Sequence, residues 1–152
     1  LILSELEHQV DASDALQCAF QHSALSLLNS AYLCQLRAIA ENYRCSDIPA
    51  VNGIKTLQAA LTTLDIPAPE AREIEVLVNE GWIGEFLQAH RQLCLPEPSP
   101  YSIDPLPDVS QSDIALRDER VEKPVLNATQ LRQWMLALEE LVQRQAEMMA
   151  EY

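Results

Sequence analysis

The chain has 152 residues, of which 48% are hydrophobic and 5% aromatic, and its formal net charge is −13. This length and hydrophobic content suit a single domain with its own core, and they exclude an intrinsically disordered chain. The acidic balance excludes nucleic-acid binding through a basic patch, because an acidic surface repels phosphate groups. Mimicry of DNA by the acidic surface stays open as an alternative.

Composition also points to an all-α fold in a reducing compartment. The chain has only three glycines and is rich in Leu, Ala, Glu and Gln, which favour helices. No apolar run is long enough to predict a membrane span, and no signal peptide is predicted at the start. The four cysteines lack CxxC spacing: Cys18, Cys34, Cys45 and Cys94. This spacing predicts reduced thiols in a cytoplasmic protein. The alternative is that some of these cysteines bind zinc.

The first two predicted elements are helices separated by a tight link. Residues 1–10 read as the end of a first helix, and residues 11–13 as the link. A long central helix is predicted over residues 14–44, starting at a capping box formed by Asp14 and Gln17. One apolar row on this helix follows Leu16, Phe20, Ala24, Leu27 and Ala31, and a second follows Leu25, Leu28, Tyr32, Leu36, Ile39 and Tyr43. Two rows make a band wider than a surface helix needs, which predicts a helix contacted on several sides.

Three shorter helices are predicted in the middle of the chain. The first is capped by Asn52 and ends at Ile66, because the residue before a proline avoids helical geometry. The second begins at Pro69, a residue favoured in the first turn, and Gly81 marks its end or a kink. The third carries Trp82, Ile83, Phe86, Leu87, His90 and Leu93 at helical spacing.

Residues 95–126 differ in character, because they hold most of the prolines and only isolated apolar residues. We expect an extended Pro-rich strap lying over the bundle, with a mobile linker as the alternative. A C-terminal helix is then predicted over residues 128–152, capped by Asn127. It carries a repeat at alternating spacings of three and four residues, formed by Leu131, Trp134, Leu138, Leu141, Gln145, Met148 and Tyr152.

Residues that could perform chemistry are few. His22 stands one helical turn after Cys18, a spacing that a base and its nucleophile can use, but it is more typical of a polar helix flank. No glycine-rich phosphate loop, Walker-type lysine, G-x-S-x-G or H-E-x-x-H pattern is present. The sequence therefore predicts no catalytic, cofactor-binding or metal-binding residues, and no enzymatic activity.

Three stretches carry a family resemblance. They are residues 18–44, the segment Asn79-Glu-Gly-Trp-Ile-Gly-Glu-Phe-Leu-Gln-Ala-His90 and the segment from Leu131 to Gln145. The chain resembles a small proteobacterial all-helical family that is classed as a domain of unknown function. This resemblance spans most of the chain except the strap. It implies a bacterial, cytoplasmic, all-helical protein and carries over no catalytic residue.

We predict an all-α, up-and-down bundle of about four to five helices in a single domain spanning residues 1–152, wrapped by the strap. The first functional hypothesis is a non-enzymatic module for protein–protein interaction or self-association, without nucleic acid or membrane partners. Its candidate interaction residues are Trp82, Trp134, Met148, Met149 and Tyr152. The alternative is a ligand-binding protein or enzyme with a pocket between the central helix and the strap, lined by Tyr43, His90 and Tyr101.

Overall fold

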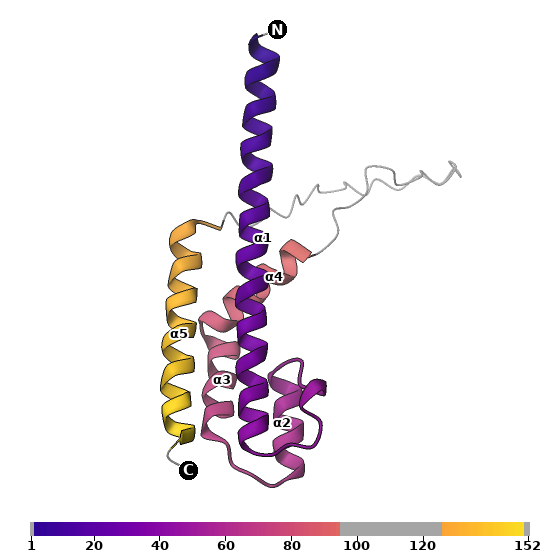
Figure 1. The fold of residues 1–152 in the computed structure, drawn as a ribbon, viewed down its shortest axis with the longest axis vertical. Coiled ribbons are helices and arrows are strands. Elements are labelled where there is room, and N and C mark those ends of the chain that lie inside the picture. Colours follow the sequence, from indigo (N-terminus) through magenta and orange to yellow (C-terminus); the bar gives the residue numbers. More distant parts are fainter. Residues whose placement is uncertain (1, 95–125, 151–152) are drawn as a thin grey trace, which may run out of the picture.

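A computed structural model describes residues 2–94 and 126–150, with side chains from residue 16 onward. These residues form an all-α helical bundle, as predicted (Figure 1). The elements are α1 (Ile2–Asn42), the short 3-10 helix η1 (Ile48–Ala50), α2 (Ile54–Thr63), α3 (Pro69–Glu80), α4 (Trp82–Cys94) and α5 (Ala128–Ala150).

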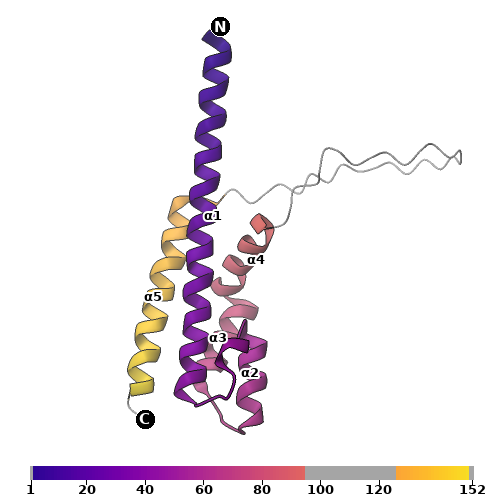
Figure 2. The same ribbon diagram turned by 45° about the vertical axis from the view of Figure 1, so that its right-hand side comes forward.

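Helix α1 is the centre of the bundle and packs against each of the other four α-helices. In the view of Figure 1, α1, α2 and α5 run downward, whereas α3 and α4 run upward between them. The start of α5 is tied to α1 by the side-chain amide of Gln21, whose Nε2 donates to the Leu126 carbonyl at 2.6 Å. Above this level α1 projects past the rest of the bundle, as Figure 2 also shows.

The predicted link at residues 11–13 is wrong, because α1 runs without a break from Ile2 to Asn42. A first helix ending at residue 10 and a new cap at Asp14 are therefore not separate features. The physical reason is that α1 contains no Gly or Pro, while Asp and Ser inside a helix each cost only about 0.5 kcal/mol relative to Ala. At about 1.5 Å per residue, the helix is roughly 60 Å long.

Helices α1 and α2 are each followed, two residues after their last residue, by a residue with left-handed backbone geometry. Arg44 has φ 55° and Asp65 has φ 53°. Beyond each of them the chain closes the helix with paired backbone bonds, such as Cys45 N to Ala40 O at 2.9 Å after α1. The central helix thus ends at Asn42, and Arg44 lies just outside its last turn rather than within it.

The core lies along one side of α1, where the second predicted row is buried: Leu25, Leu28, Tyr32, Leu36 and Ile39. An aromatic cluster joins this row to α4 and α5. The Phe86 ring meets the edge of Tyr32 at 5.9 Å between centroids and lies 6.3 Å from the Trp134 ring. Such pairs add about 0.5–1.5 kcal/mol each beyond the burial of area.

Glycine fixes the junction between α3 and α4, where a break was predicted. The two helices are separated by Gly81 alone. In the first turn of α4, a Cβ atom on Gly84 would collide with the backbone carbonyl of Val78. Only a residue without a side chain lets α4 begin so close to the last turns of α3.

Candidate functional site

An exposed apolar surface runs along α1 and α5, and we call it the α1–α5 face. Four of its large side chains are more than half exposed: Leu16 at 59%, Phe20 at 68%, Leu27 at 71% and Met135 at 53%. Its members are Leu16, Phe20, Ala24, Leu27 and Ala31 of α1 and Leu131, Met135 and Val142 of α5. A contiguous apolar surface of this kind makes the α1–α5 face the candidate interaction site of the described chain.

The α1–α5 face is hollowed into a groove between the two helices. The groove has a volume of about 710 Å³, and its floor includes Leu28 of the core row. A second hollow of about 520 Å³ continues it toward the projecting part of α1 and shares Ala24 and Leu131 with it. The two hollows are neighbours along α1.

Charge is absent from the α1 side of this face. Residues 15–36 contain no Asp, Glu, Lys or Arg, although 22% of the whole chain is charged. Charged residues line the groove only on the α5 side, at Arg132 and Glu139. A partner therefore meets an apolar strip on α1 and a small mixed-charge rim on α5, so that its approach needs no desolvation of charged groups on α1.

The structure changes the set of predicted interaction residues. Trp134 is only 4% exposed and belongs to the core, so it offers no free surface. Trp82 is half-buried, with its ring stacked 6.1 Å from Phe86, and Met148 and Met149 are also half-buried. Tyr152 lies outside the described residues.

Sequence reasoning missed Leu16, Phe20 and Leu27 as surface residues. Their row was assigned to the core, because a double row predicts contact on several sides. In the described chain the bundle covers the second row and leaves most of the first row open. The lack of charge over residues 15–36 was the available signal, since a solvated helix face normally carries charged residues.

Two of the three residues of the predicted pocket, Tyr43 and His90, lie apart in the structure. Tyr43 follows the C-terminal end of α1, where its hydroxyl donates to Glu70 Oε2 at 2.8 Å. His90 lies near the C-terminal end of α4, with its Nε2 at 3.7 Å from Cys94 Sγ. These two helix ends lie at opposite ends of the bundle body in Figures 1 and 2, so the two side chains do not line one pocket. Tyr101 lies outside the described residues.

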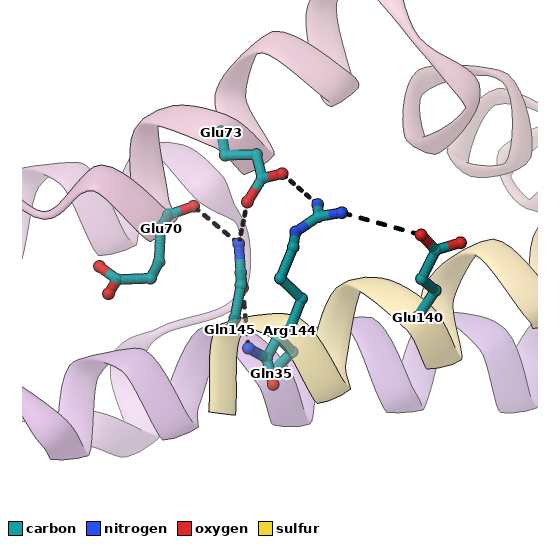
Figure 3. Close-up of polar contacts among 6 residues, drawn as sticks. All are labelled: Gln35, Glu70, Glu73, Glu140, Arg144 and Gln145. Carbon is teal, nitrogen blue, oxygen red and sulfur yellow. Dashed lines mark hydrogen bonds and ion pairs between the residues drawn. The ribbon is translucent and has the colours of Figure 1, made fainter. Parts of the chain in front are cut away.

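A buried polar cluster joins α1, α3 and α5 (Figure 3). Gln145 is fully buried, and its Oε1 accepts from Gln35 Nε2 at 2.8 Å. Its Nε2 donates to the Glu70 carbonyl at 3.2 Å and to Glu73 Oε2 at 2.9 Å. Glu73 also pairs with Arg144, which is within 4.0 Å of Glu140.

The arrangement of this cluster is structural. Its hydrogen bonds satisfy Gln145 on both sides, and the described part of the chain leaves no buried side-chain nitrogen or oxygen without a partner. A polar side chain at a core position fixes the register of packed helices, because any slip would strand its donors and acceptors. We therefore assign the cluster to the docking of α5 rather than to chemistry.

Side chains are described for residues 16–94 and 126–150, and among them no three of His, Cys, Asp or Glu gather into a group that could hold a metal ion. The pair of His90 and Cys94 is joined by no third His, Cys, Asp or Glu in a metal-type group there. Cys18 and His22 are both exposed on α1. Over the same described ranges, no helix combines the length and the apolar character needed to cross a membrane.

Comparisons with known proteins assign no function to this chain. No family model, curated protein or solved structure matches the chain. The proposed function therefore rests on the exposure and the lining of the α1–α5 face.

Proposed function

We propose that this chain is a non-enzymatic cytoplasmic assembly module that binds an apolar α-helix on its α1–α5 face. The observation that carries the proposal is the open apolar row of Leu16, Phe20 and Leu27, set beside the groove on a charge-free stretch of α1. Four free cysteines, three of them exposed, suit a reducing compartment.

A helix suits the groove because the groove lies between two parallel helices. Side chains of a third helix can pack into the furrow between two others, at interaxial distances of about 8–10 Å. Along α1 the open row extends from Leu16 to Ala31, about 22 Å or four helical turns. Burying the four exposed large side chains would contribute on the order of 5 kcal/mol before the costs of association.

The lining of the groove favours a partner helix over a reactive substrate. Its polar members Arg132, Glu139 and Gln143 are exposed and come from one helix, α5. They do not form the converging set of polar groups that fixes a small ligand in a pocket.

The proposal is tested by native mass spectrometry and sedimentation velocity on the full chain, purified gently from its own host. We expect a complex heavier than the 17.0 kDa chain. Leu27→Glu should weaken this complex at least tenfold, because it places a charge in the open row. The matched control is Val76→Glu, which changes an exposed apolar residue of α3 outside the face and should leave the complex intact.

Circular dichroism would establish that both variants are folded. A wild-type chain that remains at the mass of one chain over all accessible concentrations would contradict the proposal. So would a complex that Leu27→Glu and Val76→Glu weaken equally, since the α1–α5 face would then have no special role.

A further inference from the structure

We propose that Asn52 is a site of spontaneous deamidation, and that the hydroxyl group of Thr56 restrains this reaction in the folded chain. Asn52 is exposed and is followed by Gly53, the residue that caps α2. The inference concerns the start of α2 and does not depend on the proposed function of the α1–α5 face.

The reaction needs only the chain itself and water, and asparagine is among the thermolabile residues of proteins. The backbone nitrogen of Gly53 loses its proton and attacks Cγ of Asn52. The Cγ–Nδ2 bond then breaks, and Nδ2 takes up a proton and leaves as ammonia, which closes a succinimide ring. Water opens this ring at one of its two carbonyls. The product at position 52 is either aspartate or isoaspartate, whose main chain runs through the former side chain.

Glycine at position 53 leaves the attacking nitrogen unhindered, because no side chain stands beside it. No atom of a residue beyond its two chain neighbours lies within 4 Å of the place where a Cβ atom on Gly53 would be. Its φ of 177° is extended backbone that any residue adopts. Gly53→Ala therefore adds steric hindrance to ring closure without a clash in the fold.

Thr56 holds the groups that the reaction must free. The Gly53 N–H donates to Thr56 Oγ1 at 3.1 Å, and the Asn52 N–H donates to the same oxygen at 3.0 Å. The Thr56 hydroxyl lies 2.8 Å from the Gly53 carbonyl oxygen and 3.3 Å from Asn52 Oδ1, either of which can accept its proton. A hydrogen-bonded N–H exchanges its proton with water only after local opening. Since the attacking nitrogen must first lose that proton, the folded start of α2 slows the reaction.

The isoaspartate product would lengthen a segment that is anchored on both sides. Val51 is buried, and its carbonyl oxygen accepts from Arg37 Nε at 3.1 Å. Ile54 is also buried, and its backbone is hydrogen-bonded to Tyr32 of α1. Isoaspartate adds one atom to the main chain between these two anchors, so at least one of them must shift from its packed position. We therefore expect isoaspartate at position 52 to destabilise the fold.

Ageing of the full chain in mildly alkaline buffer, followed by peptide mapping with mass spectrometry, tests the site. The fractions of amide, aspartate and isoaspartate at position 52 are measured against time. The free peptide of residues 50–58 gives the rate without the fold, and we expect the folded chain to react about tenfold more slowly than this peptide. Asn79 is the internal control, because it is exposed in α3 and followed by Glu80, and it should keep its amide.

Three variants test the roles of the neighbours. Thr56→Val removes the hydroxyl group and should speed the reaction about fivefold, because loss of a capping bond raises the population of the opened turn. Thr56→Ser keeps a hydroxyl group and should react at close to the wild-type rate. Gly53→Ala should slow the reaction about tenfold, since it hinders ring closure. Circular dichroism establishes that each variant is folded.

The site and the restraint can fail separately. A rate at Asn52 no higher than that at Asn79 in both the wild type and Thr56→Val would overturn the site. A wild-type chain that reacts as fast as the free peptide would overturn the restraint, whether or not Thr56→Val folds. So would a folded Thr56→Val chain that reacts no faster than the wild type.

The structural consequence is measured on the aged protein. Chains with isoaspartate at position 52 are separated from unaged chains by ion exchange and unfolded in urea. Asn52→Asp is the matched control, because it carries the same new charge beside the positive start of α2 and keeps the main-chain length. We expect a lower urea midpoint for the isoaspartate form than for Asn52→Asp, and equal midpoints would overturn the predicted destabilisation.

Discussion

The pKa of Tyr32 shows how the core of this bundle changes the chemistry of a single side chain. Its side chain is 3% exposed and meets the edge of the Phe86 ring. Burial raises the pKa of Tyr32 from 10.0 to about 12, and a hydrogen bond from the backbone of Ile54 opposes part of that rise. The folded chain therefore keeps this phenol protonated at pH values where the unfolded chain loses the proton.

This difference predicts a loss of stability at high pH. Between pH 10.0 and about 12 unfolding releases the Tyr32 proton, so the free energy of unfolding should fall by about 1.4 kcal/mol per pH unit. The total loss from this residue is about 2–3 kcal/mol, with no further change below or above that window. Urea unfolding of the wild type and Tyr32→Phe at several pH values measures it. A constant difference in stability between the two proteins from pH 9 to 12 would contradict the prediction.

The buried position of Gln145 could be predicted from the sequence, but its hydrogen-bond partners could not. The spacing of three and four residues in α5 correctly indicated a position on the apolar repeat, and the residue is fully buried. Its partners were not predictable, because Gln35 lies on α1 and Glu70 and Glu73 lie on α3. Local spacing identifies the buried face of a helix, whereas partners far away in the sequence depend on how the helices pack.

At the scale of elements, helix ends illustrate the same limit. Asn127 caps α5 as predicted, with its Oδ1 accepting from Gln130 N at 2.7 Å. The end of α1 was placed at Arg44, and the start of a helix was placed at Asp14 inside what is one helix. Asp, Ser and Arg all occur both at caps and inside helices, so neither boundary had a signal as strong as glycine or proline.

The left-handed residue after α1 gives a prediction about that helix end. Replacing Arg44 by Gly should raise the free energy of unfolding by about 0.5–1 kcal/mol, because glycine adopts φ 55° without strain. The matched control is Arg72→Gly, an exposed substitution inside α3, which should lower stability by about 1 kcal/mol. Chemical denaturation at neutral pH measures both. Destabilisation by Arg44→Gly as large as that by Arg72→Gly would show that this end does not need a left-handed residue.

Element spacing also predicted the candidate site only in part. Both apolar rows of α1 were identified from the sequence, and one row is in the core. The other row was assigned to the core as well, but Leu16, Phe20 and Leu27 are exposed in the described chain. Periodicity identifies a row of apolar side chains on a helix. Whether the same chain or a partner covers that row depends on how the whole molecule packs.

At that scale, α1 has one side that is buried in the core and another that exposes an apolar row. Leu25, Leu28 and Leu36 hold the bundle together and are in contact with its own helices. The open row and the groove beside it face outward, on a chain that is otherwise strongly acidic. The net charge of −13 makes surfaces of this chain repel acidic partners, and this repulsion is weakest on the uncharged strip of α1.

Two adjacent residues separate these roles in one experiment. Leu28 is 7% exposed and Leu27 is 71% exposed, although both are leucines in the same helical turn. Leu28→Ala should cost about 2–5 kcal/mol at every protein concentration, because it removes packed core atoms. Leu27→Ala should cost little in the isolated chain but should weaken the complex formed through the α1–α5 face, because it removes an exposed side chain of the open row. Urea unfolding of the isolated chain measures the first effect, and sedimentation velocity of the complex measures the second. A complex that Leu27→Ala leaves as tight as that of the wild type would argue against association through this row.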